Sequence, residues 1–240
     1  GALVALSYAC AAPVRAVIAL PRQFAAPLTH CPFCSFVHLH ARKYASMTTT
    51  HLLYLHGFRS SPQSAKARQM AAYVAQHHPG VTFWCPQLPP SPRAAMALVA
   101  QGIAHWPRDA TAVMGSSLGG FYASWVAQHA GCPSVMLNPA VYPARDLARY
   151  IGEQTTWQNP SERFFFLPEY TGELQALGTH AQPHAAPELV IIAKGDEVLD
   201  WQEMAGRYPQ AQQWVQEGGD HALSNFSDYL PTVAEFLGLA

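Results

Sequence analysis

From His51 onward, short apolar runs alternate with longer amphipathic segments, and this alternation restricts the possible fold more than any other feature. The apolar runs have the length of buried strands, whereas the segments between them have helical periodicity. We expect strands at 51–56, 81–85, 110–114, 134–138, 189–193 and 213–216, and helices at 64–78, 92–106, 119–128, 201–208 and 227–237. Such an order favours a mostly parallel sheet of about six strands with helices on both faces, an α/β fold. The less regular section 139–187 is expected to form a small irregular cap.

The pentapeptide Gly115-Ser116-Ser117-Leu118-Gly119 lies between a predicted strand and a predicted helix. This is the setting of a nucleophile elbow, in which a serine stands at the apex of a tight turn. The turn requires small residues two positions before and after the serine, and Gly115 and Gly119 meet this requirement. The pattern G-x-S-x-G also occurs in glycine-rich turns without chemistry, so the interpretation depends on its setting. We predict that Ser117 is an exposed nucleophile.

Other groups suited to catalysis also follow predicted strands. They are the segment His56-Gly57-Phe58, the acidic cluster 196–200 and His221. The carboxyl ends of parallel strands share one edge of the sheet, where ligand sites form, so we expect these groups to lie close to Ser117.

A serine hydroxyl needs a base to take its proton and a carboxylate to orient that base. In α/β-hydrolases these residues follow the chain order Ser, acid, His, which Ser117, Asp196 and His221 reproduce. Of the 12 histidines, His221 is the one that follows a predicted strand in a glycine-rich loop. We prefer Asp196 as the acid because it is nearest the strand end, and Asp200 remains the alternative.

Acyl transfer also requires N–H donors for the oxyanion that develops on the substrate. The residue after the nucleophile supplies one donor, which is Leu118 here. The turn that begins with His56-Gly57 would supply the second from Phe58, although the same residues also suit an ordinary strand-to-helix turn. The neighbouring Arg59 would either meet an anionic substrate group or be solvated, and we expect solvation. The aromatic side chains of Phe58, Tyr122, Trp157 and 164–166 would either line an apolar acyl site or pack in the core, and we expect core packing.

Charge and hydropathy exclude two classes of partner. The 240-residue chain has a net charge of −1, which gives no electrostatic case for binding nucleic acid. No apolar run reaches the roughly 18 residues that a membrane span requires. Residues 1–46 contain basic but no acidic residues and precede the first methionine, Met47. We interpret them as an N-terminal extension that is poorly ordered or results from a misplaced start, with a transit-type segment as the alternative, and 47–240 as the folded domain.

The extension contains Cys31-Pro32-Phe33-Cys34, followed by His38 and His40, a spacing that invites a redox or zinc assignment. No strand and helix flank the cysteine pair, and the two histidines are too close together for a finger-like site. We therefore assign no metal. The 5 cysteines are scattered rather than arranged as a disulfide framework, which favours a reducing, cytoplasmic location.

Five segments together carry a family resemblance. They are Leu55-His56-Gly57-Phe58-Arg59-Ser60-Ser61-Pro62 with Ser64-Ala65-Lys66, Gly115-Ser116-Ser117-Leu118-Gly119-Gly120-Phe121-Tyr122, Leu137-Asn138-Pro139-Ala140-Val141, Gly195-Asp196-Glu197-Val198-Leu199-Asp200 and Gly218-Gly219-Asp220-His221. In this order the chain resembles the YqiA-like esterases, which are small bacterial α/β-hydrolases. The resemblance covers essentially all of 47–240.

The resemblance implies an α/β-hydrolase fold whose sheet begins at the strand carrying His56-Gly57. It also implies hydrolysis of short-to-medium acyl esters, or of acyl-CoA thioesters, without a cofactor. The family's triad corresponds to Ser117, Asp196 and His221, and its oxyanion loop to Phe58. The divergent section 142–187 would shape the acyl pocket. A serine peptidase with the same triad, and a binding module that retains the fold without catalysis, are the alternatives.

Overall fold

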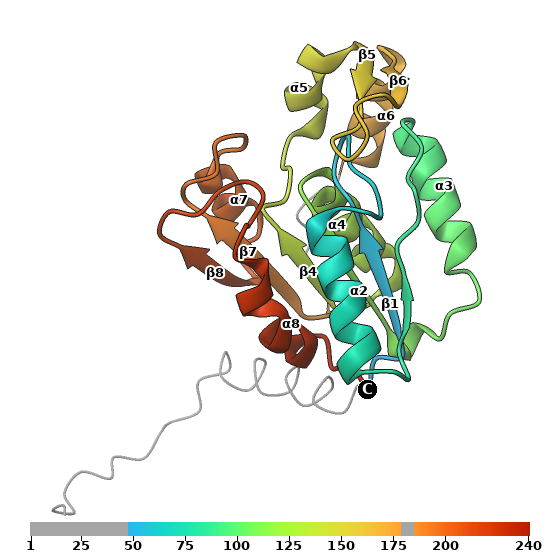
Figure 1. The fold of residues 1–240 in the computed structure, drawn as a ribbon, viewed down its shortest axis with the longest axis vertical. Helices are drawn as coiled ribbons and strands as arrows, with labels where there is room; N and C mark the ends of the chain where they lie inside the picture. Colours follow the sequence, from blue (N-terminus) through green and yellow to red (C-terminus); the bar gives the residue numbers. More distant parts are fainter. Residues whose placement is uncertain (1–47, 179–184) are drawn as a thin grey trace, which may run out of the picture.

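The computed structural model describes residues 48–178 and 185–240, and its centre is a parallel sheet with strand order β2-β1-β3-β4-β7-β8 (Figure 1). The strands are β1 (His51–Leu55), β2 (Thr82–Trp84), β3 (Thr111–Ser116), β4 (Ser134–Leu137), β7 (Glu188–Ala193) and β8 (Gln212–Gln216). All pairings in this sheet are parallel, and β1 and β3 pair from His51↔Thr111 to Leu55↔Gly115. The six predicted strands and the α/β class are therefore confirmed.

The five helices that the sequence predicts are also present. They are α2 (Ala65–His77), α3 (Pro92–Gly102), α4 (Leu118–Ala130), α7 (Trp201–Arg207) and α8 (Leu230–Phe236), with short 3-10 turns η1 (Arg108–Ala110) and η3 (Phe226–Tyr229). The hydroxyl of Ser91 caps α3 by accepting a hydrogen bond of 3.1 Å from the Ala94 amide. The predicted helix 92–106 ends earlier, at Gly102, where any side chain would collide with the Trp84 ring.

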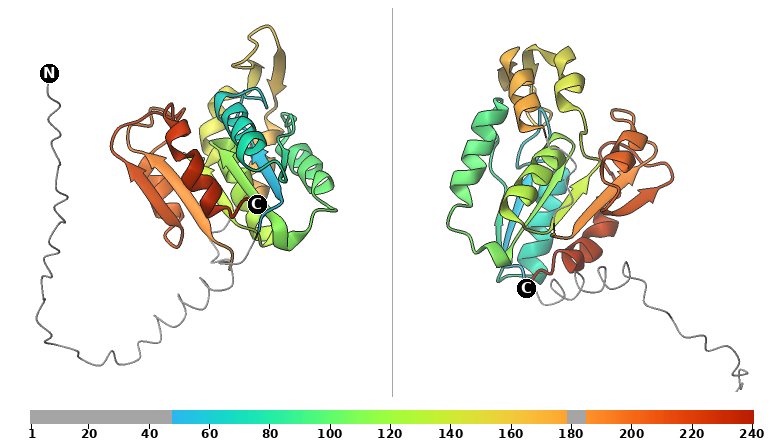
Figure 2. Two further views of the ribbon diagram at one scale, coloured as in Figure 1. Left: turned by 60° about the horizontal axis from the view of Figure 1, so that its bottom comes forward. Right: turned by 180° about the vertical axis from the view of Figure 1, so that it is seen from behind.

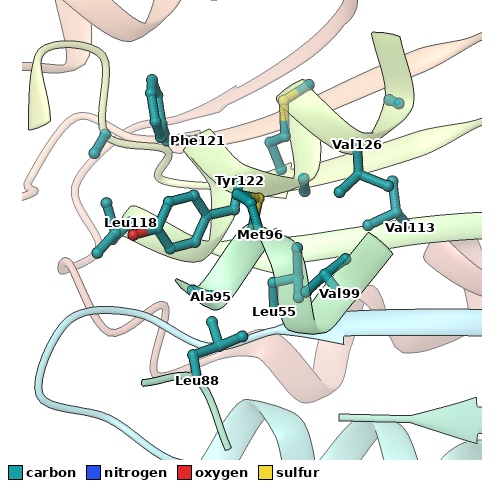
Figure 3. Close-up of a cluster of buried hydrophobic side chains, with 14 of the residues drawn as sticks. Leu55, Leu88, Ala95, Met96, Val99, Val113, Leu118, Phe121, Tyr122 and Val126 are labelled. Atoms are coloured by element: carbon teal, nitrogen blue, oxygen red, sulfur yellow. The ribbon is translucent and has the colours of Figure 1, made fainter. Parts of the chain in front are cut away.

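Two apolar layers enclose the sheet, because successive side chains of a strand point to opposite faces. In β1, Leu53 and Leu55 pack with residues of α3 and α4, whereas Leu52 and Tyr54 pack with α2 and α8. Figure 1 shows α2 and α8 in front of the sheet, and the right-hand view of Figure 2 shows α3 and α4 on the opposite face. Figure 3 shows part of the layer beneath α3 and α4.

The section expected to be irregular contains regular elements. It consists of α5 (Pro143–Leu147), the 3-10 turn η2 (Ala148–Tyr150), an antiparallel hairpin of β5 (Gly152–Thr155) and β6 (Arg163–Phe166), and α6 (Glu169–Leu177). These strands are only 4 residues long, too short to give a clear periodic signal. This cap lies at the top of Figure 1, beyond the end to which the β1 arrow points.

The domain's first described residues meet its C-terminus, because Thr49 forms an isolated bridge with Leu239. The predicted extension, with its cysteine and histidine cluster, lies outside the described residues, so the boundary at residue 47 stays a prediction. Among the helices within the described ranges, none combines the length and the apolar character needed to cross a bilayer.

Candidate active site

Ser117 stands in a sharp turn between β3 and α4. Its backbone has φ 57° and ψ −121°, a strained conformation for a residue other than glycine. A Cβ atom added to Gly115 would lie 2.1 Å from the Gly119 carbonyl oxygen, and one added to Gly119 would lie 1.9 Å from the Leu55 carbonyl oxygen. Both positions therefore accept only glycine, which is the steric requirement expected for a nucleophile elbow.

His221 lies between Ser117 and Asp196. Its Nε2 is 3.0 Å from Ser117 Oγ, and its Nδ1 is 2.7 Å from Asp196 Oδ2. An ionised carboxylate can only accept, so Nδ1 donates to Asp196, and Nε2 accepts from the serine hydroxyl. The Asp196 side chain is fully buried and that of His221 is 20% exposed. The structure thus brings together the three residues that the sequence proposes for a triad.

The two candidate acids make different contacts. Asp196 Oδ1 accepts hydrogen bonds of 2.8 Å from the amides of Val198 and Leu199, which leaves Oδ2 for His221. Asp200 is the N-cap of α7, where its Oδ1 accepts from the Gln202 amide. The geometry therefore favours Asp196 as the partner of the histidine.

Asn138, at the end of β4, supports the loop that carries His221. It is fully buried and has a positive φ of 40°. Its Oδ1 accepts from the Ala193 amide at 2.8 Å, and its Nδ2 donates to the carbonyl oxygens of Asp220 and His221 at 3.0 and 3.3 Å. Asn138 belongs to one of the five motif segments, but the sequence predicts no role for it. Its position directly after a buried strand was the available signal.

Two further side chains hold the same loop. The Glu197 carboxylate accepts a hydrogen bond of 3.0 Å from the His221 amide, and Lys66 Nζ donates to the Ala222 carbonyl oxygen. Burial lowers the pKa of the Lys66 ammonium to about 8, although Asp220 and Asp196 act against this decrease. The base is thus fixed through its backbone as well as its ring.

The segment His56-Gly57-Phe58 lies against the nucleophile. A Cβ atom added to Gly57 would lie 3.2 Å from Ser117 Cβ, so glycine allows this close approach. Leu118 is the first residue of α4 and has no intrahelical acceptor for its amide. In the part of the chain that the structure describes, neither the Phe58 nor the Leu118 amide donates a hydrogen bond to another protein group.

The His56 ring supports this segment from beneath. Its Nε2 accepts a hydrogen bond of 3.1 Å from the Leu88 amide, so its Nδ1 carries the proton and donates to the Gly57 carbonyl oxygen at 3.0 Å. The side chain is buried, and burial lowers the pKa of the imidazole, which keeps the ring neutral. His56 is therefore a fixed structural link and not a second base.

A pocket of about 320 Å³ lies beside this segment. Apolar side chains from the core and the cap line it (Phe58, Leu88, Leu118, Tyr122, Phe164). Figure 3 labels Leu88, Leu118 and Tyr122. Thr156 and Glu162 of the cap also line it. The expected core packing is correct for Tyr122 and Phe166, which are buried. It is wrong for Trp157 and Phe165, which are 64% and 60% exposed.

Arg59 is not solvated as the sequence analysis expects. Arg59 is half-buried, and its guanidinium donates two hydrogen bonds to Thr155 and lies over the Trp157 ring. The expectation was wrong because the partners are about a hundred residues away along the chain, on a hairpin that the sequence did not indicate.

The described part of the chain contains two free thiols, Cys85 and Cys132, and burial raises the pKa of each to about 12. Both are therefore unreactive near neutral pH. No group of three or more His, Cys, Asp or Glu side chains within 48–178 and 185–240 is arranged to hold a metal ion.

Comparison with known proteins agrees with this geometry. Residues 51–238 match the family described as "Uncharacterised protein family (UPF0227)", which is the YqiA family, so the resemblance in the sequence is confirmed. A putative hydrolase from Agrobacterium vitis has a similar fold, with a TM-score of 0.64 and 16% identity over 79% of this chain and 90% of that chain. Mouse alpha/beta hydrolase domain-containing protein 10 is also similar (TM-score 0.61, 15% identity, 80% and 92% of the chains). So is the esterase domain of a Rhodothermus marinus protein (TM-score 0.59, 17% identity, 80% and 86%). At these identities the likeness establishes the α/β-hydrolase fold.

Proposed function

We propose that this chain, which belongs to the uncharacterised protein family UPF0227, is a serine esterase that cleaves carboxylic esters through an acyl-enzyme intermediate. The observation that carries the proposal is the placement of His221 between Ser117 Oγ, at 3.0 Å, and Asp196 Oδ2, at 2.7 Å. Such a chain of contacts lets a serine lose its proton as it attacks.

In the acylation step, Ser117 Oγ attacks the ester carbonyl carbon while His221 Nε2 takes the hydroxyl proton. The Asp196 carboxylate keeps the ring in the required tautomer and stabilises the imidazolium that forms. His221 then gives the proton to the leaving alkoxide, the bond from carbon to this oxygen breaks, and the acyl group remains on Ser117. In the second half, water attacks the acyl-enzyme with His221 again as base, and the acid is released.

The amides of Phe58 and Leu118 are the proposed donors to the oxyanion of each tetrahedral intermediate. The support for this role is their position on the two segments that meet at Ser117 and their lack of other acceptors among the described residues. Each donor of this kind contributes about 3 kcal/mol to transition-state stabilisation.

The apolar pocket beside Phe58 and Leu118 is the proposed site of the acyl chain. Its volume of about 320 Å³ suits a short or medium chain, and its aromatic lining favours apolar acyl groups. Oxygen esters and acyl-CoA thioesters both fit the chemistry. We find no sequence feature that would recognise a peptide backbone, which disfavours a peptidase. A non-catalytic binding module would not account for the alignment of Ser117, His221 and Asp196. The cytoplasmic location stays a prediction from the cysteine pattern.

A fluorophosphonate probe and a series of p-nitrophenyl esters test the proposal. We expect the wild-type protein to be labelled and to hydrolyse the esters, and Ser117→Ala to lose labelling and at least about 10⁴-fold of kcat. Ser116→Ala, which removes the neighbouring hydroxyl, is the control and should retain labelling. A wild-type protein that is silent in both assays would exclude the esterase, and turnover by Ser117→Ala would exclude this nucleophile.

The acid is tested in the same assays by a matched pair of variants. We expect Asp196→Asn to lower kcat by about 10⁴-fold, because the amide can stabilise the wrong tautomer of His221. Asp200→Asn, which alters only the cap of α7, should retain nearly full activity. The reverse result would assign the triad to Asp200. A parallel acyl-CoA series with thiol detection measures the preference between esters and thioesters.

A further inference from the structure

The cap hairpin contacts the proposed oxyanion loop through Arg59, the residue that follows Phe58. Arg59 Nε donates to the Thr155 carbonyl oxygen at 2.7 Å, and a terminal guanidinium nitrogen donates to Thr155 Oγ1 at 2.9 Å. The guanidinium carbon lies 4.1 Å from the centre of the Trp157 ring. Two nitrogens of the Arg59 guanidinium are thus hydrogen-bonded, and one face of the group is covered by a ring. The planar arginine side chain permits this geometry, and lysine does not.

The Arg59 backbone is also held by the hairpin. Its φ is 59°, in the left-handed region that side chains other than glycine disfavour. The Trp157 amide donates a hydrogen bond of 2.8 Å to the Arg59 carbonyl oxygen. A strained conformation of this kind persists only where the surrounding structure fixes it, and here β5 and the residues after it supply the contacts.

The Phe58 side chain is anchored to the same cap. Its ring packs against those of Tyr150, Phe164 and Phe166, with centroids 5.5, 5.9 and 5.2 Å away. On the N-terminal side of Phe58, the His56 ring donates a hydrogen bond to the Gly57 carbonyl oxygen. The Phe58 amide is therefore restrained by the residue before it, by its own ring and by the residue after it.

Direct binding of an anionic substrate by Arg59 is the competing role. Two of the guanidinium nitrogens already donate to Thr155, and Trp157 covers one face. Glu162 lines the same pocket, and its negative charge opposes the approach of an anion. These contacts favour a structural task for Arg59 over an electrostatic one.

We propose that Arg59 is a positioning residue that ties the oxyanion loop to the β5–β6 hairpin and so fixes the Phe58 amide for the transition state. This inference rests on the proposed esterase function. Thr155 and Trp157 then act through Arg59, because they set the geometry of a donor that the hairpin does not itself contain.

Arg59→Lys and Thr155→Val test this role with a neutral p-nitrophenyl ester. Lysine keeps the charge but loses the fork, and valine removes one acceptor while retaining the side-chain shape. We expect kcat to fall about ten- to hundredfold in Arg59→Lys with KM nearly unchanged, because a misplaced donor affects the transition state more than the bound substrate. The loss in Thr155→Val should be smaller and in the same direction. Arg163 lies on the same hairpin, is exposed and pairs with Glu153. The variant Arg163→Lys is therefore the control and should retain kcat.

Arg59→Gly provides a second route if the lysine variant folds poorly. Glycine accepts the positive φ without strain, so thermal stability should be largely retained while kcat falls. Unchanged kcat in both Arg59 variants, with Ser117-dependent activity in the wild type, would overturn this inference alone. A rise in KM confined to anionic esters would instead assign Arg59 to substrate binding and also overturn it. An inactive wild-type protein would overturn the proposed function and this inference together.

Discussion

At the scale of single residues, the buried Asn138 side chain forms hydrogen bonds with three backbone groups. Its side chain joins the end of β7, through the Ala193 amide, to the carbonyl oxygens of Asp220 and His221. The contact with the Ala193 amide is buried and those with the two carbonyl oxygens are part-buried, so loss of the side chain leaves the buried amide unpaired. Asn138 therefore links the stability of the sheet edge to the position of the histidine.

We predict that Asn138→Ala lowers the free energy of unfolding by about 2–3 kcal/mol, because the buried Ala193 amide loses its acceptor. It should also reduce esterase kcat, since the His221 loop loses its support. Urea denaturation with an unchanged m-value measures the first effect. Ser134→Ala, on the preceding strand β4, removes a buried hydroxyl that has no hydrogen-bond partner among the described residues and should be neutral or stabilising. Equal losses in the two variants would contradict the role of Asn138.

The sequence indicated some of the site residues and not others for a physical reason. Ser117, Asp196 and His221 each follow a strand in a glycine-containing turn, and chain order assigns them complementary chemistry. The roles of Arg59 and His56 depend on partners that are distant along the chain, Thr155 and Leu88. No local pattern contains such a pairing, so these contacts had to come from the structure.

At the scale of elements, Glu173 holds the cap helix α6 to the N-terminus of α3. Its carboxylate accepts from the Ser91 hydroxyl at 2.7 Å, from the Arg93 amide at 3.0 Å and from the Arg93 guanidinium at 2.6 Å. Burial raises the pKa of the Glu173 carboxyl, but the hydrogen bonds from Ser91 and Arg93 outweigh it and hold the pKa below its usual value. The charged form is thus the one that the folded protein favours.

Glu173→Gln is expected to destabilise the protein by about 1–2 kcal/mol at pH 7, a modest value because the Arg93 side chain is 78% exposed and its ion pair is screened. Because the folded-state pKa is depressed, this contribution is present above the unfolded carboxyl pKa and is lost as the pH falls through the folded value. The difference in Tm between wild type and variant should therefore shrink from pH 7 towards pH 3.

Glu153→Gln is the control for this measurement, because Glu153 forms an exposed pair with Arg163 on the cap hairpin. It should change Tm little at any pH. A Tm difference for Glu173→Gln that stays constant or grows on acidification would show that the carboxylate does not hold α6 to α3.

The elements of the sheet were predictable and those of the cap were not. β1, β3 and β7 are almost entirely buried, so each appears in the sequence as an unbroken apolar run. In β5 and β6 buried, half-buried and exposed positions are mixed, and tertiary contacts such as the Phe58 ring cluster stabilise the hairpin. Local sequence therefore carries little information about this part of the fold.

At the scale of the whole molecule, the six-stranded sheet and all the proposed site residues lie after Thr48. We predict that deletion of residues 1–46 leaves Tm and ester hydrolysis unchanged. Thermal unfolding and p-nitrophenyl ester turnover of the truncated and full chains measure this. A large fall in Tm would show that the extension contributes to the fold, and the predicted boundary at residue 47 would then be wrong.

The bridge between Thr49 and Leu239 brings the two ends of the domain together. The Ala240 amide donates to the Thr49 carbonyl oxygen at 3.1 Å, so the two ends of the domain are adjacent. A short linker can join neighbouring ends with little strain, and an exposed turn such as Pro209-Gln210, between α7 and β8, offers a place to open the chain anew. The α/β-hydrolase domain is therefore a natural candidate for circular permutation, in which β8 would become the first strand while Ser117, Asp196 and His221 keep their places in space.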